Sequence, residues 1–149
     1  MKQLDEIIYD AITADTDLMT AIGSRVVSTC FEVPPGEDDN TPIPNVIITD
    51  DGFQNSVGTK DTVWESGEDS VLVIVDVAAQ SRNEVKALIK AVRRAIEAHI
   101  VSLYEQGEDT PVLEPGFPKS NGLAWDWEKP CYYQKLMYQC TTPSDTDNE

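Results

Sequence analysis

Apolar residues recur at helical spacing at the start of the chain. The series consists of Leu4, Ile7, Ile8, Ala11 and Ile12. This spacing places the apolar side chains on one face of a helix of about three turns. Asp15 then predicts the N-cap of a second, short helix, which is expected to end at Gly23.

Three later segments are rich in β-branched and apolar residues and therefore predict strands. They are residues 26–33, 46–49 and 70–79. The third is apolar on both faces as far as Ile74, so we expect it at the centre of a sheet, covered on both sides. The turn residues 50–52 are expected to end the second strand, and the polar stretch 53–69 to form a long hairpin arm.

The longest predicted helix follows the third strand. Ser81 fits the N-cap of a capping box that Glu84 completes three residues later. An apolar stripe then indicates a helix to about Tyr104. The stripe consists of Val85, Leu88, Ile89, Val92, Ile96, Ile100 and Leu103. After a proline-containing loop over residues 107–121, the segments 123–127 and 131–141 predict a second hairpin.

This order of elements predicts one small α+β domain over residues 1–142, followed by a polar tail at 143–149. We expect a mostly antiparallel sheet of about four to five strands. The long helix and the N-terminal helix should pack against it, and the hairpin arm should extend from it.

Charge is the most unusual property of the composition. The 149 residues include 27 Asp and Glu against 11 Lys and Arg, which gives a formal net charge of −16. Such a surface repels nucleic-acid phosphates and anionic membranes, and no apolar stretch approaches the ~20 residues of a membrane span. Three explanations stay open: solubility alone, a basic protein partner, or a surface that stays near DNA without binding it.

No residue pattern predicts catalysis, a cofactor or a metal site. The sequence lacks GxSxG, HExxH and a glycine-rich phosphate loop. The acidic runs 37–39 and 50–51 match no EF-hand loop, so they are expected to be solvated turns. A site assembled from Asp76, His99 and loop carboxylates is the remaining enzymatic alternative. We predict instead that the protein is not an enzyme and that His99 is a partly buried structural residue.

Two kinds of potentially reactive side chain receive structural interpretations. The cysteines Cys30, Cys131 and Cys140 show no CxxC spacing, so a zinc site is not expected. Cys131 and Cys140 would point to opposite faces of one strand, and small buried apolar roles are predicted for the cysteines. Asp76 interrupts an apolar strand and is expected where the strand emerges, or paired with a basic side chain.

Four of the eleven cations lie on one face of the long predicted helix, turned away from most of the apolar stripe. They are Lys86, Lys90, Arg93 and Arg94. They are either an ordinary solvated face or a basic strip that contacts an acidic surface of a neighbouring subunit. Trp64, in the predicted arm, is a further candidate for a subunit interface. Trp125 and Trp127 share one face of a predicted strand, and are core residues or, if exposed, interface anchors.

Three stretches together carry a resemblance to a known family. They are DTDLMTAIGSRV, TPIPNVIIT and VLVIVDVAAQSRNEVKALIKAVRRAIE. In order and pattern they resemble the phage tail-completion or tail-terminator proteins, which sit at the head-proximal end of the tail. The resemblance covers roughly the first two thirds of the chain.

The resemblance implies a structural protein that forms a ring, commonly a hexamer, on the tail tube and joins it to the head connector. It implies host cytoplasm during assembly and the virion tail afterwards, and it brings no catalytic residue and no cofactor. DNA would pass through the ring without specific binding, and an acidic lumen would repel its phosphates. A ring needs contacts between unlike faces, and the basic strip would supply one of them.

An acidic protein-binding module is the alternative function, either an immunity protein or a DNA mimic that blocks a nucleic-acid enzyme. The charge and the small size fit this alternative. A mimic should space its carboxylates along one face like phosphates, whereas here they are distributed over loops and termini.

Overall fold

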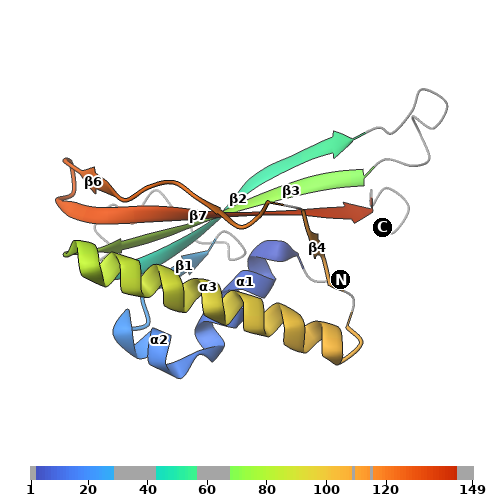
Figure 1. Cartoon of the computed structure of the whole chain (residues 1–149), viewed down its shortest axis with the longest axis horizontal. Coiled ribbons are helices and arrows are strands. Elements are labelled where there is room, and N and C mark those ends of the chain that lie inside the picture. The colour runs from blue at the N-terminus through green and yellow to red at the C-terminus, as the bar shows by residue number, and fades with distance from the viewer. Residues whose placement is uncertain (1–2, 29–42, 57–67, 109, 115, 144–149) are drawn as a thin grey trace.

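The computed structural model describes residues 3–28, 43–56, 68–108, 110–114 and 116–143. Within them, three helices lie on one side of a mixed sheet (Figure 1). The helices are α1 (Leu4–Ala14), α2 (Thr16–Ala21) and α3 (Arg82–Glu105). The strands are β1 (Val26–Ser28), β2 (Asn45–Ser56), β3 (Glu68–Ala79), β4 (Val112–Leu113), β5 (Lys119–Ser120), β6 (Ala124–Asp126) and β7 (Cys131–Pro143).

The sheet has the order β1-β2-β3-β7-β4, and β5 and β6 also pair with β7. Only β1 and β2 are parallel among the described pairs, so the predicted α+β class with a mostly antiparallel sheet is confirmed. The segments β4, β5 and β6 meet successive parts of β7 and together form one interrupted edge strand. The prediction of a loop over residues 107–121 was therefore wrong for β4 and β5.

The two N-terminal helices form as the sequence predicts. The Asp15 carboxylate accepts a hydrogen bond from the backbone N–H of Leu18 at 3.1 Å, which caps α2. The helix is followed by Gly23, whose φ of +61° suits a glycine. Arg25 then donates from Nε to the carbonyl oxygen of Pro44 at 2.9 Å. This bond ties the end of the helical pair to the start of β2.

The predicted end of the second strand at residues 50–52 was wrong. β2 continues to Ser56, and its pairing with β3 shifts register between Asp50 and Phe53. Gly52 has a φ of +92° and donates its N–H to the Asp50 carboxylate at 2.8 Å. An Asp–Gly sequence suits a β-bulge as well as a turn, and here the long partner strand keeps the pairing going.

The hairpin arm is confirmed as far as the pair Ser56 and Glu68, because β2 and β3 remain paired to that point. The tip of the predicted arm, including residues 62–64, lies outside the described residues. The predicted strand 26–33 is described only to Ser28, where β1 ends.

The long helix α3 begins and ends close to the predicted positions. The Ser81 hydroxyl accepts from the Glu84 N–H at 3.1 Å, as the capping box requires, and the helix ends at Glu105. Every position of the predicted stripe is buried or half-buried. The fully packed members are Val85, Leu88, Val92 and Ile96.

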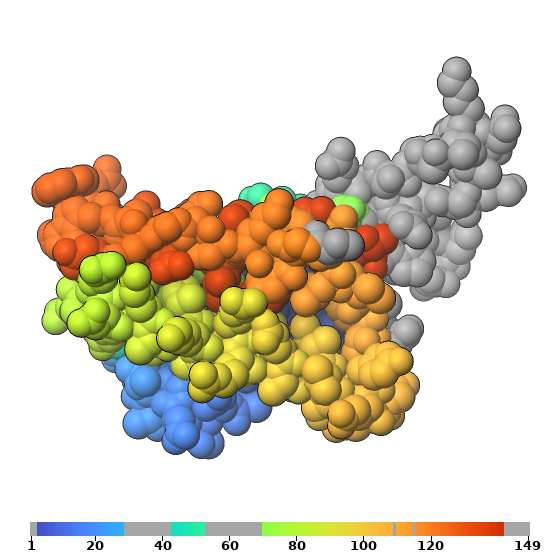
Figure 2. Space-filling model, viewed as in Figure 1, coloured from blue at the N-terminus to red at the C-terminus, as the bar shows by residue number. Residues whose placement is uncertain are grey.

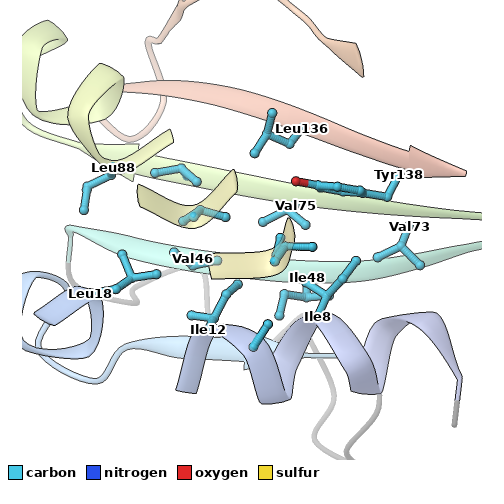
Figure 3. Close-up of a cluster of buried hydrophobic side chains, with 14 of the residues drawn as sticks. Ile8, Ile12, Leu18, Val46, Ile48, Val73, Val75, Leu88, Leu136 and Tyr138 are labelled. Atoms are coloured by element: carbon cyan, nitrogen blue, oxygen red, sulfur yellow. The ribbon is translucent and has the colours of Figure 1, made fainter. Parts of the chain in front are cut away.

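The core lies between the helices and one face of the sheet (Figure 3). On β3 the buried residues Val73, Val75 and Val77 alternate with the half-exposed residues Leu72 and Ile74. β3 is thus central, as predicted, but no described helix covers its second face (Figure 1). The expected helical cover on the second side is thus not seen among the described residues, and the side chains of that face are half-buried.

The helices divide the covered face between them. α1 packs over β1 and β2, whereas α3 packs over β3 and β7 and also contacts α1. This division gives the helical layer two flanks, one formed by α1 and α2 and the other by the side of α3 that borders β7.

Candidate functional site

The basic strip, defined by Lys86, Lys90, Arg93 and Arg94, is exposed along α3 as the periodicity predicts. Glu97 contacts Arg93, with 3.1 Å between Nε and Oε1. The other three cations make no ion pair within the described part of the chain. Arg82, the first residue of α3, is also exposed and extends the positive charge toward the start of the helix.

Tyr138 on β7 identifies the flank on which the strip lies. Burial raises the pKa of Tyr138 far above its usual range, the nearby Glu97 carboxylate raises it further, and Arg93 lowers it. Arg93 and Glu97 are therefore close to β7. Figure 2 shows α3 as a ridge, with the blue α1 and α2 on one side and the orange segments of the interrupted edge on the other. The strip thus borders β7, away from α1 and α2.

The opposite flank is acidic. Residues 3–24 contain five carboxylates and no Lys, Arg or His. Asp5 is buried, with 6% of its surface exposed, and Asp15 caps α2. The remaining three, Glu6, Asp10 and Asp17, are half-buried or exposed. We call α1 and α2 with these three carboxylates the acidic hairpin.

An aromatic tip formed by Trp125, Trp127 and Tyr132 stands at the turn between β6 and β7. The rings contact edge-on, with centroids 4.8 Å apart for Trp125 and Tyr132 and 6.1 Å apart for Trp125 and Trp127. Asp126 accepts from the N–H groups of Glu128 and Lys129 at 3.0 and 3.4 Å and so fixes the turn. Trp127 is nevertheless 85% exposed.

The predicted placement of Trp125 and Trp127 on one strand face was wrong, because β6 ends at Asp126 and Trp127 belongs to the turn. Of the two interpretations, core or interface anchor, the exposure of Trp127 supports the anchor. The register pairs Tyr132 with Ala79, and α3 begins shortly afterwards at Arg82. The aromatic tip therefore lies at the same end of the molecule as the first turn of α3 (Figure 1).

Asp76 and His99, the two named residues of the enzymatic alternative, are not brought together. Asp76 lies on the sheet face that carries no described helix, whereas His99 is half-buried on α3, on the other side of the sheet. Its partial burial agrees with the structural role predicted for it. Among the described residues, no group of three His, Cys, Asp or Glu side chains could hold a metal ion.

The cysteines behave as buried apolar residues where they are described. Cys131 and Cys140 are free thiols, 3% and 0% exposed. Burial, with a smaller contribution from the negative charge of Glu114, raises the pKa of Cys140 to about 11. At neutral pH this cysteine is therefore almost entirely in its thiol form. Cys30, Trp64 and the acidic run 37–39 lie outside the described residues.

Asp76 pairs with a basic side chain, as one of its two predicted environments requires. Lys135 lies opposite it on β7, with 3.7 Å between Nζ and Oδ1. Burial raises the pKa of Asp76 above its usual range, and the charge and hydrogen bond of Lys135 oppose this effect only in part. The folded protein consequently holds the Asp76 proton more tightly than the unfolded chain does.

This raised pKa predicts a pH effect on stability. Since the folded state binds more protons, the contribution of Asp76 to stability falls as the pH rises through its usual range and its raised pKa. The variant Asp76→Asn should therefore gain stability relative to the wild type between about pH 4 and pH 7. Urea unfolding at both pH values measures the change, with the exposed Glu105→Gln as control. An equal difference between wild type and Asp76→Asn at the two pH values would contradict the prediction.

Comparison with solved structures finds the same fold in a virus-like particle. A chain from the "Virion of native gene transfer agent (GTA) particle" superimposes with a TM-score of 0.51 and 14% sequence identity. The match covers 94% of this chain and 94% of the other. At this identity the likeness shows a shared fold over nearly the whole of both chains. No protein-family model matches the sequence, and no curated protein matches it significantly.

Within the described residues, no helix combines the length and the apolar character needed to cross a membrane. The described surface features that stand out are the basic strip and the aromatic tip on one flank, and the acidic hairpin on the other. Helical periodicity identified the strip before the structure did. The acidic hairpin was missed, although the absence of any cation in residues 3–24 was a readable signal. For Trp127 the sequence left core and exposed positions open, and the structure shows the exposed one.

Proposed function

We propose that this protein is a structural component of a virion, and that it forms a ring at the head-proximal end of a tail tube and joins the tube to the head connector. The observation that carries the proposal is the fold shared over 94% of both chains with a chain of a gene transfer agent virion. The order of elements supports the more specific role, since it resembles that of phage tail-completion proteins. The protein acts by assembly in this role, without catalysis.

The surfaces of the chain suit such an assembly. The aromatic tip lies at the end of the molecule where α3 and its basic strip begin. Exposed cations and an exposed tryptophan are typical of protein interfaces. The remaining surface is strongly acidic, as the net charge of −16 requires. DNA that passes through a ring of such subunits meets repulsion rather than binding.

Native mass spectrometry and negative-stain electron microscopy of the purified chain test the proposal. We expect a closed ring with one defined number of subunits, and antibodies against the chain should label the junction between head and tail in intact particles. Loss of the protein should leave heads and tails unjoined. A chain that stays monomeric at every concentration, or particles that join normally without it, would contradict the proposal.

A further inference from the structure

We infer that the acidic hairpin of one copy binds the basic strip of the next copy. This inference rests on the proposed ring and names the two surfaces that close it. It depends on three properties of the described residues: which cations are available, where the two surfaces lie, and how their charges are spaced.

The strip holds cations that are available to another molecule. Elsewhere in the described chain, Arg25 is bound to the Pro44 carbonyl, Lys119 lies over the Phe117 ring at 4.8 Å, and Lys135 pairs with Asp76. On α3 only Arg93 has an ion-pair partner within the described residues. On a chain of net charge −16, this strip is where an acidic surface of a second copy is attracted rather than repelled.

The position of the two surfaces favours pairing between copies over pairing within one. The strip borders β7, because α3 packs against β7 (Figure 2) and presents Arg93 and Glu97 on the side near Tyr138. Within the acidic hairpin, α1 packs over β1 and β2, and α2 contacts α1 and the side of α3 that faces away from β7 (Figure 2). Contact between these unlike surfaces is heterologous, so an open chain of copies ends in one strip and one hairpin that contact no other copy until a ring closes.

The charges on the two surfaces repeat at the same spacing. Glu6 and Asp10 are four residues apart on α1, and the series Lys86, Lys90 and Arg94 has the same spacing on α3. Four residues of α-helix rise by about 6 Å, so two helices lying side by side can match carboxylates to cations in register. Asp17, exposed at the start of α2, provides a further carboxylate.

Charge reversal on each surface tests the inference. The strip variant carries Lys90→Glu and Arg94→Glu, and the hairpin variant carries Glu6→Lys and Asp10→Lys. Each variant alone presents like charges at the contact, so its subunit dissociation constant should rise by about tenfold or more at ~0.15 M salt. An equal mixture of the two should assemble again, because every contact in an alternating ring then joins opposite charges. One chain that carries all four changes should also form rings.

The full-length protein is studied by analytical ultracentrifugation and native mass spectrometry, and thermal unfolding checks that each variant is folded. The control Glu105→Lys with Glu108→Lys makes the same change in net charge as the hairpin variant, but at and just beyond the C-terminal end of α3. It should assemble like the wild type. If a reversal prevents folding, the neutral variants Lys90→Gln with Arg94→Gln and Glu6→Gln with Asp10→Asn replace it. Each of these should weaken assembly, and an unchanged dissociation constant would overturn the inference.

The outcomes separate this inference from the proposed function. A wild-type chain that never self-associates contradicts the ring itself, and the inference with it. A wild type that forms rings while the folded single-surface variants assemble equally well contradicts only the pairing of strip with hairpin. Failure of both the mixture and the four-change chain to recover assembly leads to the same conclusion. In the wild type the dissociation constant should rise steeply with salt, and a salt-independent ring would also overturn the inference.

Discussion

Replacing Ile96 by alanine is expected to lower the free energy of unfolding by about 3–4 kcal/mol. Ile96 is 0% exposed and lies in the middle of α3, in the cluster between that helix and the sheet. Truncation removes three carbon atoms from this cluster, and the surrounding helices and strands limit how far the space can collapse. Urea unfolding followed by circular dichroism measures the loss.

The exposed Val101 on the same helix provides the control for Ile96. It is 54% exposed, so Val101→Ala should change the free energy of unfolding by less than about 0.5 kcal/mol. A loss below about 1 kcal/mol for Ile96→Ala would show that α3 is not packed on the sheet as described. The proposed interface would then lose its structural support, because the basic strip is positioned by the same helix.

Replacing Trp127 by alanine should have the opposite profile, with little effect on folding and a large effect on assembly. Its side chain is 85% exposed, so the free energy of unfolding should change by less than about 0.5 kcal/mol. A tryptophan that becomes buried at a subunit contact typically contributes about 2 kcal/mol or more, which corresponds to roughly a 30-fold weaker association. Sedimentation of the purified protein over a range of concentrations measures the change.

Tyr104 is the matched control for Trp127. It is 74% exposed and aromatic, but it lies in the last turn of α3, away from the tip between β6 and β7. Tyr104→Ala should therefore leave assembly unchanged. Equal association of the Trp127→Ala and Tyr104→Ala proteins would remove the aromatic tip from the proposed interface.

Elements whose signals are local were predicted from the sequence. The caps at Asp15 and Ser81 depend on side chains that bond to backbone groups three residues away, and both were identified. The buried side of α3 follows from periodicity alone, and so does the position of the basic strip. These features need no knowledge of distant parts of the chain.

Features that depend on a distant partner were not predicted. The sequence of residues 50–52 is compatible with a turn or with a β-bulge. The structure has a bulge there, because pairing with β3 resumes between Phe53 and Val71. The short segments β4 and β5 have two residues each, and their extended form comes from β7 rather than from a pattern of their own. Periodicity gave the face of α3 that carries the strip, but not the flank of the molecule on which that face lies. The flank depends on how α3 packs beside Tyr138 on β7, which comes much later in the chain.

The interrupted edge beside β7 has a consequence for how copies can meet. A long, regular edge strand offers a continuous row of backbone N–H and C=O groups, onto which another chain can add as a strand and continue into a fibre. Here the edge is divided into segments of two, two and three residues, with Pro118 and Gly122 between them. An interrupted edge of this kind disfavours the addition of a strand from another copy, so contacts between copies on this flank are left to side chains.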